Sequence, residues 1–163
     1  YKNLLTIIIP RHIERLDEIK TQLHQINLKT YSFQSNIKIS KDTDIFIVDT
    51  YGRSNSFYNY CKTVFLGGSI INHGGQNPLE AARHGCKILH GPNVNNFKEI
   101  YKFLKKNGLS KKINNQKELI HSLNLLLSKK TNTKIMQKKI VEIGQKILKR
   151  SYEEINLLIK NEI

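Results

Sequence analysis

The chain has 163 residues, and its 27 lysines and arginines against 13 aspartates and glutamates give a formal net charge of +14. It contains only 9 glycines and 3 prolines, which excludes a collagen-like or a proline- and glycine-rich disordered chain. Two cysteines are too few for a disulfide framework, and no apolar run approaches the roughly 20 residues that a membrane-spanning helix needs.

Short apolar runs alternate with helical patterns from the first residues to about position 108. The β-branched and apolar runs predict strands over 4–9, 31–34, 45–48, 64–66 and 87–89. Spacings of three and four residues between apolar side chains, together with start and stop signals, predict helices over 13–26, 56–61, 77–84 and 97–104. This alternation is typical of an α/β chain with a Rossmann-like parallel sheet and helices on both faces.

The last third of the chain is predicted to be helical, with no strong strand after Gln116. One helix is expected over 119–127, and a long one over 136–158 that Gly144 or the Arg150-Ser151 region could interrupt. The first residues, which begin at Tyr1 and lead straight into an apolar run, suggest one domain, 1–163, cut from a longer protein.

Polar and glycine residues follow the predicted strands. In an open parallel sheet the carboxyl ends of the strands share one edge, and ligands bind there. The loops after Ile9, Val48, Leu66 and Leu89 are therefore expected to form the site.

The loop that begins at Gly67 is the richest of these segments. It places glycine pairs between a strand and a helix, where backbone N–H groups could approach a phosphate. Its spacing fits neither a dinucleotide fingerprint nor a P-loop. An equally acceptable explanation is a structural loop that needs positive φ angles.

The helix after this loop begins with Asn77-Pro78-Leu79-Glu80, which resembles a capping box. Capping alone explains Asn77 and Glu80. Alternatively, the Glu80 carboxylate accepts hydrogen bonds from two adjacent sugar hydroxyls. Arg11 and His12 follow the first strand, where they are either a phosphate-binding pair or a solvated pair at the edge of the sheet.

Several other chemistries are not expected. The six histidines lack the spacing of zinc ligands, no Ser-His-Asp set is discernible, and Cys86 is interpreted as a core residue. The lysine excess reflects either biased genome composition or attraction to an anionic surface such as a membrane. Aromatic residues are not interleaved with the lysine pairs, so no nucleic acid partner is expected.

Four motifs in order resemble those of 3-deoxy-D-manno-octulosonic acid (Kdo) transferases, which are GT-B glycosyltransferases of lipid A core assembly in lipopolysaccharide biosynthesis. They are Pro10-Arg11-His12 with Glu14-Arg15, Asp49-Thr50-Tyr51-Gly52, Gly67-Gly68-Ser69 with 73–80, and His90-Gly91-Pro92 with 96–100. The likeness is dense from about Leu4 to Gly108. Two positions depart from the family, which commonly has His where Gln76 stands and Glu where Arg53 stands.

The resemblance implies the C-terminal, nucleotide-sugar-binding half of an inverting, metal-independent enzyme without cofactors. The donor would be CMP-Kdo and the acceptor a lipid A precursor, at the cytoplasmic face of the inner membrane. The catalytic base and the membrane anchor would belong to the N-terminal half, so these 163 residues alone are expected to be inactive. The alternative is a basic, non-catalytic module that binds nucleotides or an anionic surface.

The resemblance also assigns the donor site. Arg11 would meet the phosphate with His12 beside it, assisted by Ser69 and the backbone of Gly68 and Gly75. Gln76 would hydrogen-bond, Asn77 would fix the start of the helix, and Glu80 would hold the ribose hydroxyls.

Overall fold

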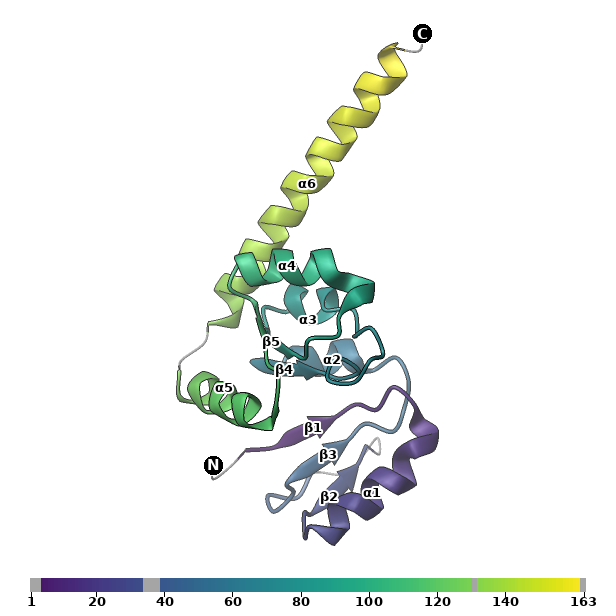
Figure 1. Ribbon diagram of the computed structural model, residues 1–163, viewed down its shortest axis with the longest axis vertical. Coiled ribbons are helices and arrows are strands. Elements are labelled where there is room, and N and C mark those ends of the chain that lie inside the picture. The colour runs from purple at the N-terminus through teal and green to yellow at the C-terminus, as the bar shows by residue number, and fades with distance from the viewer. Residues whose placement is uncertain (1–3, 34–38, 130–131, 162–163) are drawn as a thin grey trace. The chain divides into compact units, whose positions relative to one another are not determined.

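The structure is a computed structural model that describes residues 4–33, 39–129 and 132–161. The chain divides into two compact units, residues 1–56 and 57–163. Each unit contains one three-stranded sheet in which neighbouring strands are parallel (Figure 1). The helix α2 (Ser54–Tyr58) contains the boundary between the units.

The first unit places its strands in the order β1-β3-β2, with β1 over Thr6–Ile8, β2 over Thr30–Ser32 and β3 over Ile45–Ile47. The central strand β3 is fully buried, and the Phe46 ring packs against Tyr31 and Phe33 with centroid distances of 6.0 and 6.1 Å. The strand predicted over 4–9 is shorter and only half-buried, because β1 has one neighbour in this sheet.

The helix predicted over 13–26 is present as a short 3-10 turn, η1 (Ile13–Arg15), followed by α1 (Leu16–Gln25). The strand predicted over 31–34 corresponds to β2, and its last predicted residue, Gln34, lies outside the described residues.

The second unit has the strand order β4-β5-β6, with β4 over Thr63–Leu66, β5 over Lys87–His90 and β6 over Ser110–Lys112. Between these strands lie α3 (Leu79–Arg83), the 3-10 turn η2 (Asn95–Phe97) and α4 (Lys98–Lys106). Ile88 of β5 belongs to a buried cluster with α3 and α4, to which both alanines of α3 and Tyr101 and Leu104 of α4 contribute.

The strand β6 was not predicted from the sequence. Its residues are Ser110, Lys111 and Lys112, of which only the serine is buried. A polar strand with a neighbour on one side only gives no hydrophobic alternation to detect. The preceding Asn107-Gly108 turn, predicted as a helix end, does terminate α4.

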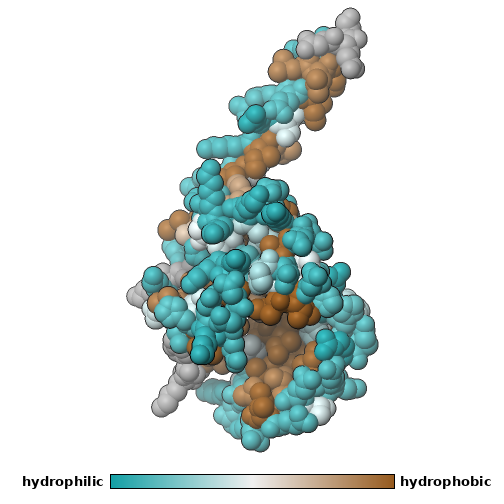
Figure 2. Space-filling model, viewed as in Figure 1, coloured by the Kyte–Doolittle hydropathy of each residue, from teal (hydrophilic) through white to brown (hydrophobic). Residues whose placement is uncertain are grey.

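Two helices complete the chain, α5 (Gln116–Ser128) and α6 (Thr133–Asn161). The prediction of a break at Gly144 or near Arg150 is wrong, because α6 is continuous through both positions. One glycine costs a helix only about 1 kcal/mol, and Ile140, one turn earlier, is buried with α3. Figure 2 shows apolar patches along α6, where large side chains such as Leu148 and Leu158 are exposed.

Candidate functional site

The loop after β4 is fastened to the segment that follows β5. The Gly91 N–H donates to the Ser69 hydroxyl at 2.8 Å, and the Asn93 N–H donates to the Ser69 carbonyl at 2.9 Å. The Asn93 side-chain amide donates to the Ile70 carbonyl at 2.9 Å. The predicted meeting of these two loops at the carboxyl ends of parallel strands is therefore present within the second unit.

Ser69 is fully buried, and its hydroxyl is used by the protein itself. It donates to the Leu66 carbonyl at 2.6 Å while accepting from Gly91. A β-carbon at Gly91 would collide with the Ser69 carbonyl, so the segments around Ser69 and Gly91 can approach this closely only with glycine at position 91. We therefore assign Ser69 to holding the loop in place rather than to touching a phosphate.

The glycine loop closes on itself at Gly68 and Gly75. The Gly75 N–H donates to the Gly68 carbonyl at 3.1 Å. Gly75 has a φ of +76°, which L side chains rarely adopt, and a β-carbon there would lie 3.1 Å from the Asn93 carbonyl oxygen. The explanation of a structural loop with positive φ angles is thus correct for this part of the motif, and it is compatible with a ligand above the loop.

Gln76 is held through its backbone rather than its side chain. The Tyr101 hydroxyl of α4 donates to the Gln76 carbonyl at 2.9 Å. The Gln76 side-chain nitrogen would lie 3.6 Å from a β-carbon built on Gly68, so its amide lies close to that glycine.

His90, the last residue of β5, contacts both Tyr101 and the backbone of Gly91. Its ring centroid lies 4.3 Å from that of Tyr101, and its Nδ1 lies 2.7 Å from the Gly91 carbonyl oxygen. Burial lowers the pKa of His90, the hydrogen bond to the Gly91 carbonyl opposes this shift, and the positive charges of Lys112 and Lys105 add to it, so the ring is neutral at pH 7. Because a carbonyl oxygen can only accept, the proton of the neutral ring is on Nδ1. In the sequence, His90 is visible only as part of a motif, and Tyr101 only as part of a helix pattern.

Asn77 caps the helix that follows the loop, as its sequence predicts. Its side-chain oxygen accepts from the Leu79 N–H at 3.0 Å, although regular helix begins at Leu79 rather than at Asn77. Glu80 is exposed in the first turn of α3. Its negative charge helps to raise the pKa of Tyr58, although burial of Tyr58 is the larger cause.

Arg11 and His12 belong to the first unit, where both are exposed after β1. The His12 Nδ1 lies 3.0 Å from a Glu14 carboxylate oxygen. Backbone hydrogen bonding lowers the pKa of Glu14, and hydrogen bonds from His12 and Tyr51 lower it further. Because Tyr51 follows β3, the loops after β1 and β3 meet, as predicted.

The structure thus brings together Gly68, Gly75, Gln76 and Asn77, which belong with Ser69 and Glu80 to one loop and the helix after it. Arg11 and His12 form a separate group in the other unit. Arg53, one of the two residues that depart from the pattern of the resembling family, lies with its guanidinium carbon 5.9 Å from the Phe33 ring centroid.

The described part of the chain contains no group of three histidine, cysteine, aspartate or glutamate side chains that could hold a metal ion. Cys86 is a core residue as predicted, and burial raises its pKa to about 12. Among the described helices, none has the length and apolar content that would take it across a bilayer.

Curated relatives of the chain include Kdo transferases, although no family model matches it. It is 32% identical over 138 residues to 3-deoxy-D-manno-octulosonic acid transferase of Aquifex aeolicus, and the aligned residues cover 85% of this chain and 38% of that protein. It is 34% identical over 148 residues to the Rickettsia typhi transferase, covering 87% and 32%. The chain therefore spans about a third of the length of these relatives, and the predicted resemblance is confirmed.

A solved structure has the same fold. The crystal structure of the C-terminal CMP-Kdo binding domain of WaaA from Acinetobacter baumannii matches with a TM-score of 0.77 and 24% identity. The match covers 87% of this chain and 74% of that one. It confirms the predicted α/β, Rossmann-like fold that ends in a long helix.

Proposed function

We propose that this chain is the donor-binding part of a Kdo transferase, which binds CMP-Kdo while the complete protein transfers Kdo to a lipid A precursor. The observation that carries the proposal is the loop 67–78, which hydrogen bonds at Ser69 and Gly74 hold against residues 91–96 and whose sequence matches the family motif. The resemblance to relatives that are Kdo transferases supports the choice of donor.

The loop offers backbone donors to a phosphate. Within the described residues, the N–H groups of Gly68 and Gln76 donate to no protein acceptor. Gly68 has a φ of +67°, and Gln76 follows Gly75, which has a φ of +76°. Donors fixed in this way need no reorganisation when a phosphate arrives, which favours anion binding.

The proposed roles of the side chains follow from their exposure. Glu80 accepts from the ribose hydroxyls, Asn77 fixes the helix start, and the Gln76 amide hydrogen-bonds the donor beside Gly68. Arg11 supplies the forked contact to the phosphate, with His12 next to it. Tyr101 and Ser69 act as positioning residues, because they hold the loop without facing the ligand.

The chemistry assigned to this part of the protein is stabilisation of the leaving group. Transfer breaks the bond between the anomeric carbon of Kdo and a phosphate oxygen of CMP, and negative charge accumulates on CMP. Hydrogen-bond donors aimed at that phosphate lower the barrier. We propose that the reaction inverts the anomeric centre and needs no divalent metal. The base that deprotonates the acceptor hydroxyl is proposed to lie in a part of the protein outside this chain.

The proposed location is the cytoplasmic face of the inner membrane, where the lipid acceptor would be reached. The net charge of +14 supports contact with an anionic membrane surface, since each lysine near such a surface contributes about 1 kcal/mol. No nucleic acid partner is proposed.

Thermal unfolding with nucleotides tests the donor proposal. We expect CMP and CMP-Kdo to raise the melting temperature, because a ligand at 100 times its dissociation constant adds about 2.7 kcal/mol of stability. AMP, GMP and UMP at the same concentration should raise it less. Equal shifts for all four nucleoside monophosphates would favour the alternative, a module that binds nucleotides without selecting cytidine.

A further inference from the structure

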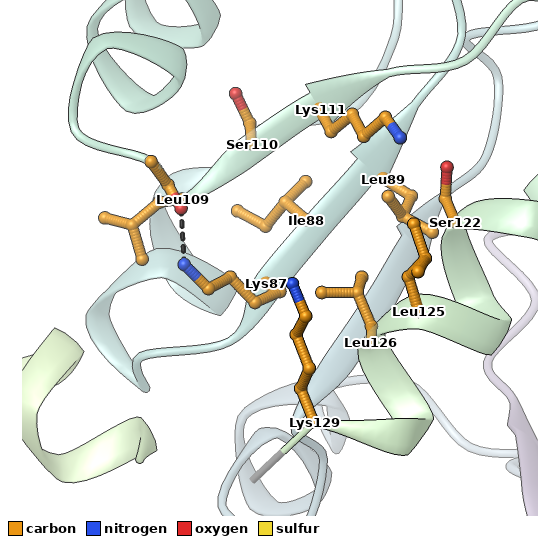
Figure 3. Close-up of a pocket in the computed structure, with 11 residues that line it drawn as sticks. Lys87, Ile88, Leu89, Leu109, Ser110, Lys111, Ser122, Leu125, Leu126 and Lys129 are labelled. Carbon is orange, nitrogen blue, oxygen red and sulfur yellow. Dashed lines mark hydrogen bonds between the residues drawn. The ribbon is translucent and has the colours of Figure 1, made fainter. Parts of the chain in front are cut away.

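A pocket of about 240 Å³ lies in the second unit, between the strands β5 and β6 and the helix α5 (Figure 3). Lys87 and Leu89 of β5 line the pocket, and they alternate along the strand with Ile88, which belongs to the α3–α4 core. Since successive side chains of a strand point to opposite faces, the pocket lies on the sheet face opposite that core, although Ile88 also borders it. No residue of the glycine loop lines it. The pocket is thus separate from the proposed donor site.

The floor and one wall of the pocket are apolar. Leu89 of β5 lies beside Leu125 and Leu126 of α5, and Leu109, whose side chain belongs to the α3–α4 core, borders the pocket next to β6. Leu125 is 42% exposed, so one of the apolar side chains that line the pocket is in contact with water. An apolar ligand group would remove that surface from water, which is favourable by about 25 cal/mol per Å².

The polar groups of the pocket carry one sign of charge. Figure 3 shows Lys87, Lys111 and Lys129 entering from β5, from β6 and from the end of α5. The Lys87 ammonium donates to the Gly108 carbonyl, and burial together with the charge of Lys139 lowers its pKa. No aspartate or glutamate is among the lining residues, so the lysines lack a carboxylate within the pocket itself.

A buried hydroxyl completes the set. Ser122 of α5 is 2% exposed, and its Oγ has no hydrogen-bond partner among the described residues. A buried hydroxyl without a partner costs roughly 1–3 kcal/mol, and a ligand oxygen would recover that energy. This observation is independent of the lysines and also indicates an oxygen-bearing ligand.

We propose that this pocket binds a small organic anion with a short alkyl chain, the chain on the leucines and the anionic head among Lys87, Lys111 and Lys129. The volume suits a chain of this size, since water occupies about 30 Å³ per molecule and 240 Å³ therefore corresponds to about eight non-hydrogen atoms. A carboxylate and a phosphate monoester share the required chemistry.

Titrations with hexanoate, hexyl phosphate, hexanol and inorganic phosphate test the proposal, followed by amide NMR shifts of the 163-residue chain. We expect hexanoate or hexyl phosphate to shift residues of 87–89, 108–111 and 122–129, and to bind about tenfold more tightly than hexanol or phosphate. Whichever of the two anions binds more tightly identifies the head group. Equal binding of hexanol, equal binding of phosphate, or shifts spread over the surface would overturn the proposal.

Matched variants in and next to α5 distinguish binding in the pocket from nonspecific binding to the surface. Lys129→Gln and Leu125→Ser should each weaken the better anion about tenfold. Lys117→Gln and Leu127→Ser change the same helix at exposed residues outside the pocket and should leave binding unchanged. Equal losses in both pairs would sink the proposal. Saturating CMP should not displace the anion, and displacement would show that the anion occupies the donor site instead.

Discussion

The Tyr101 hydroxyl of α4 donates to the backbone carbonyl of Gln76, 25 residues earlier, at 2.9 Å. This bond joins α4, in which Tyr101 and Leu104 are buried, to the glycine loop at Gln76, one of the two positions that differ from the pattern of the Kdo transferases. Because the contact is made by the carbonyl, it is independent of which side chain stands at position 76. The substitution of glutamine for histidine there can thus alter a ligand contact without releasing the loop.

Tyr101→Phe is expected to weaken CMP binding more than it weakens the fold. The variant keeps the ring, which is buried against His90, and loses one hydrogen bond with a net contribution of about 0.5–1.5 kcal/mol. We expect a several-fold weaker CMP affinity by calorimetry. Ser110→Ala is the matched control, since Ser110 donates to the Tyr101 carbonyl from β6 and does not touch the loop. A similar loss of CMP affinity in both variants would show a general loosening of α4.

Glu80→Gln separates sugar binding from capping. It keeps the shape of the side chain and removes its charge, and hydrogen bonds to charged groups contribute about 1.5–3 kcal/mol. We expect a clear loss of CMP affinity with little change in melting temperature. Glu99→Gln, which removes an exposed carboxylate paired with Lys102 on α4, should leave CMP binding unchanged. If Glu80→Gln lowers the melting temperature and CMP affinity stays the same, capping is its whole role.

Arg11 is tested by comparing CMP with cytidine. Arg11→Lys keeps the charge but loses the forked pair of donors, so CMP binding should weaken, and it should weaken further in Arg11→Ala. Cytidine lacks the phosphate and should be affected far less. Lys20→Ala, on α1 of the same unit, is a control for loss of positive charge. Equal losses for cytidine and CMP in the Arg11 variants would contradict a phosphate contact.

The parts of the fold that the sequence predicts well are those with strong apolar patterns. The run 45–48 predicts the buried strand β3, and the Asn77 signal predicts a cap that is present. The polar strand β6 and the continuity of α6 through Gly144 were missed, because both depend on neighbouring elements rather than on local composition.

The site shows the same division. Glycines after a strand identify the loop, because a backbone with positive φ selects glycine whatever the ligand. The sequence could not distinguish between two roles of Ser69, since a serine in such a loop has the same sequence signature whether its hydroxyl contacts a ligand or donates to the Leu66 carbonyl, as it does here. The contribution of Tyr101 could not be predicted, because it comes from a helix that begins 20 residues after the loop.

His90 makes the stability of the second unit depend on pH. Its pKa is lowered in the folded protein, chiefly by burial, so the unfolded chain binds this proton more strongly. The free energy of unfolding should therefore fall as the pH drops through about 6.5, the usual histidine value, and level off below the folded pKa. His90→Asn should reduce this slope between pH 6.5 and 5. His121→Asn, at an exposed position on α5, should leave it unchanged, and an unaltered slope in His90→Asn would contradict the assignment.

The 163 residues are expected to unfold cooperatively and bind CMP weakly, yet transfer no Kdo. The second unit has a buried core of its own, and the proposed ribose and phosphate contacts lie within the chain. Among the described carboxylates, Glu80 has its proposed role at the ribose, and Asp49 follows β3 in the first unit. General-base catalysis is worth about 10²–10⁴-fold, and loss of acceptor positioning costs more. Purified chain, CMP-Kdo and a lipid A precursor should give no product, with or without EDTA, while the full-length protein should be active in both conditions. Transfer by the 163 residues alone would place the base within them, and loss of full-length activity with EDTA would contradict metal independence.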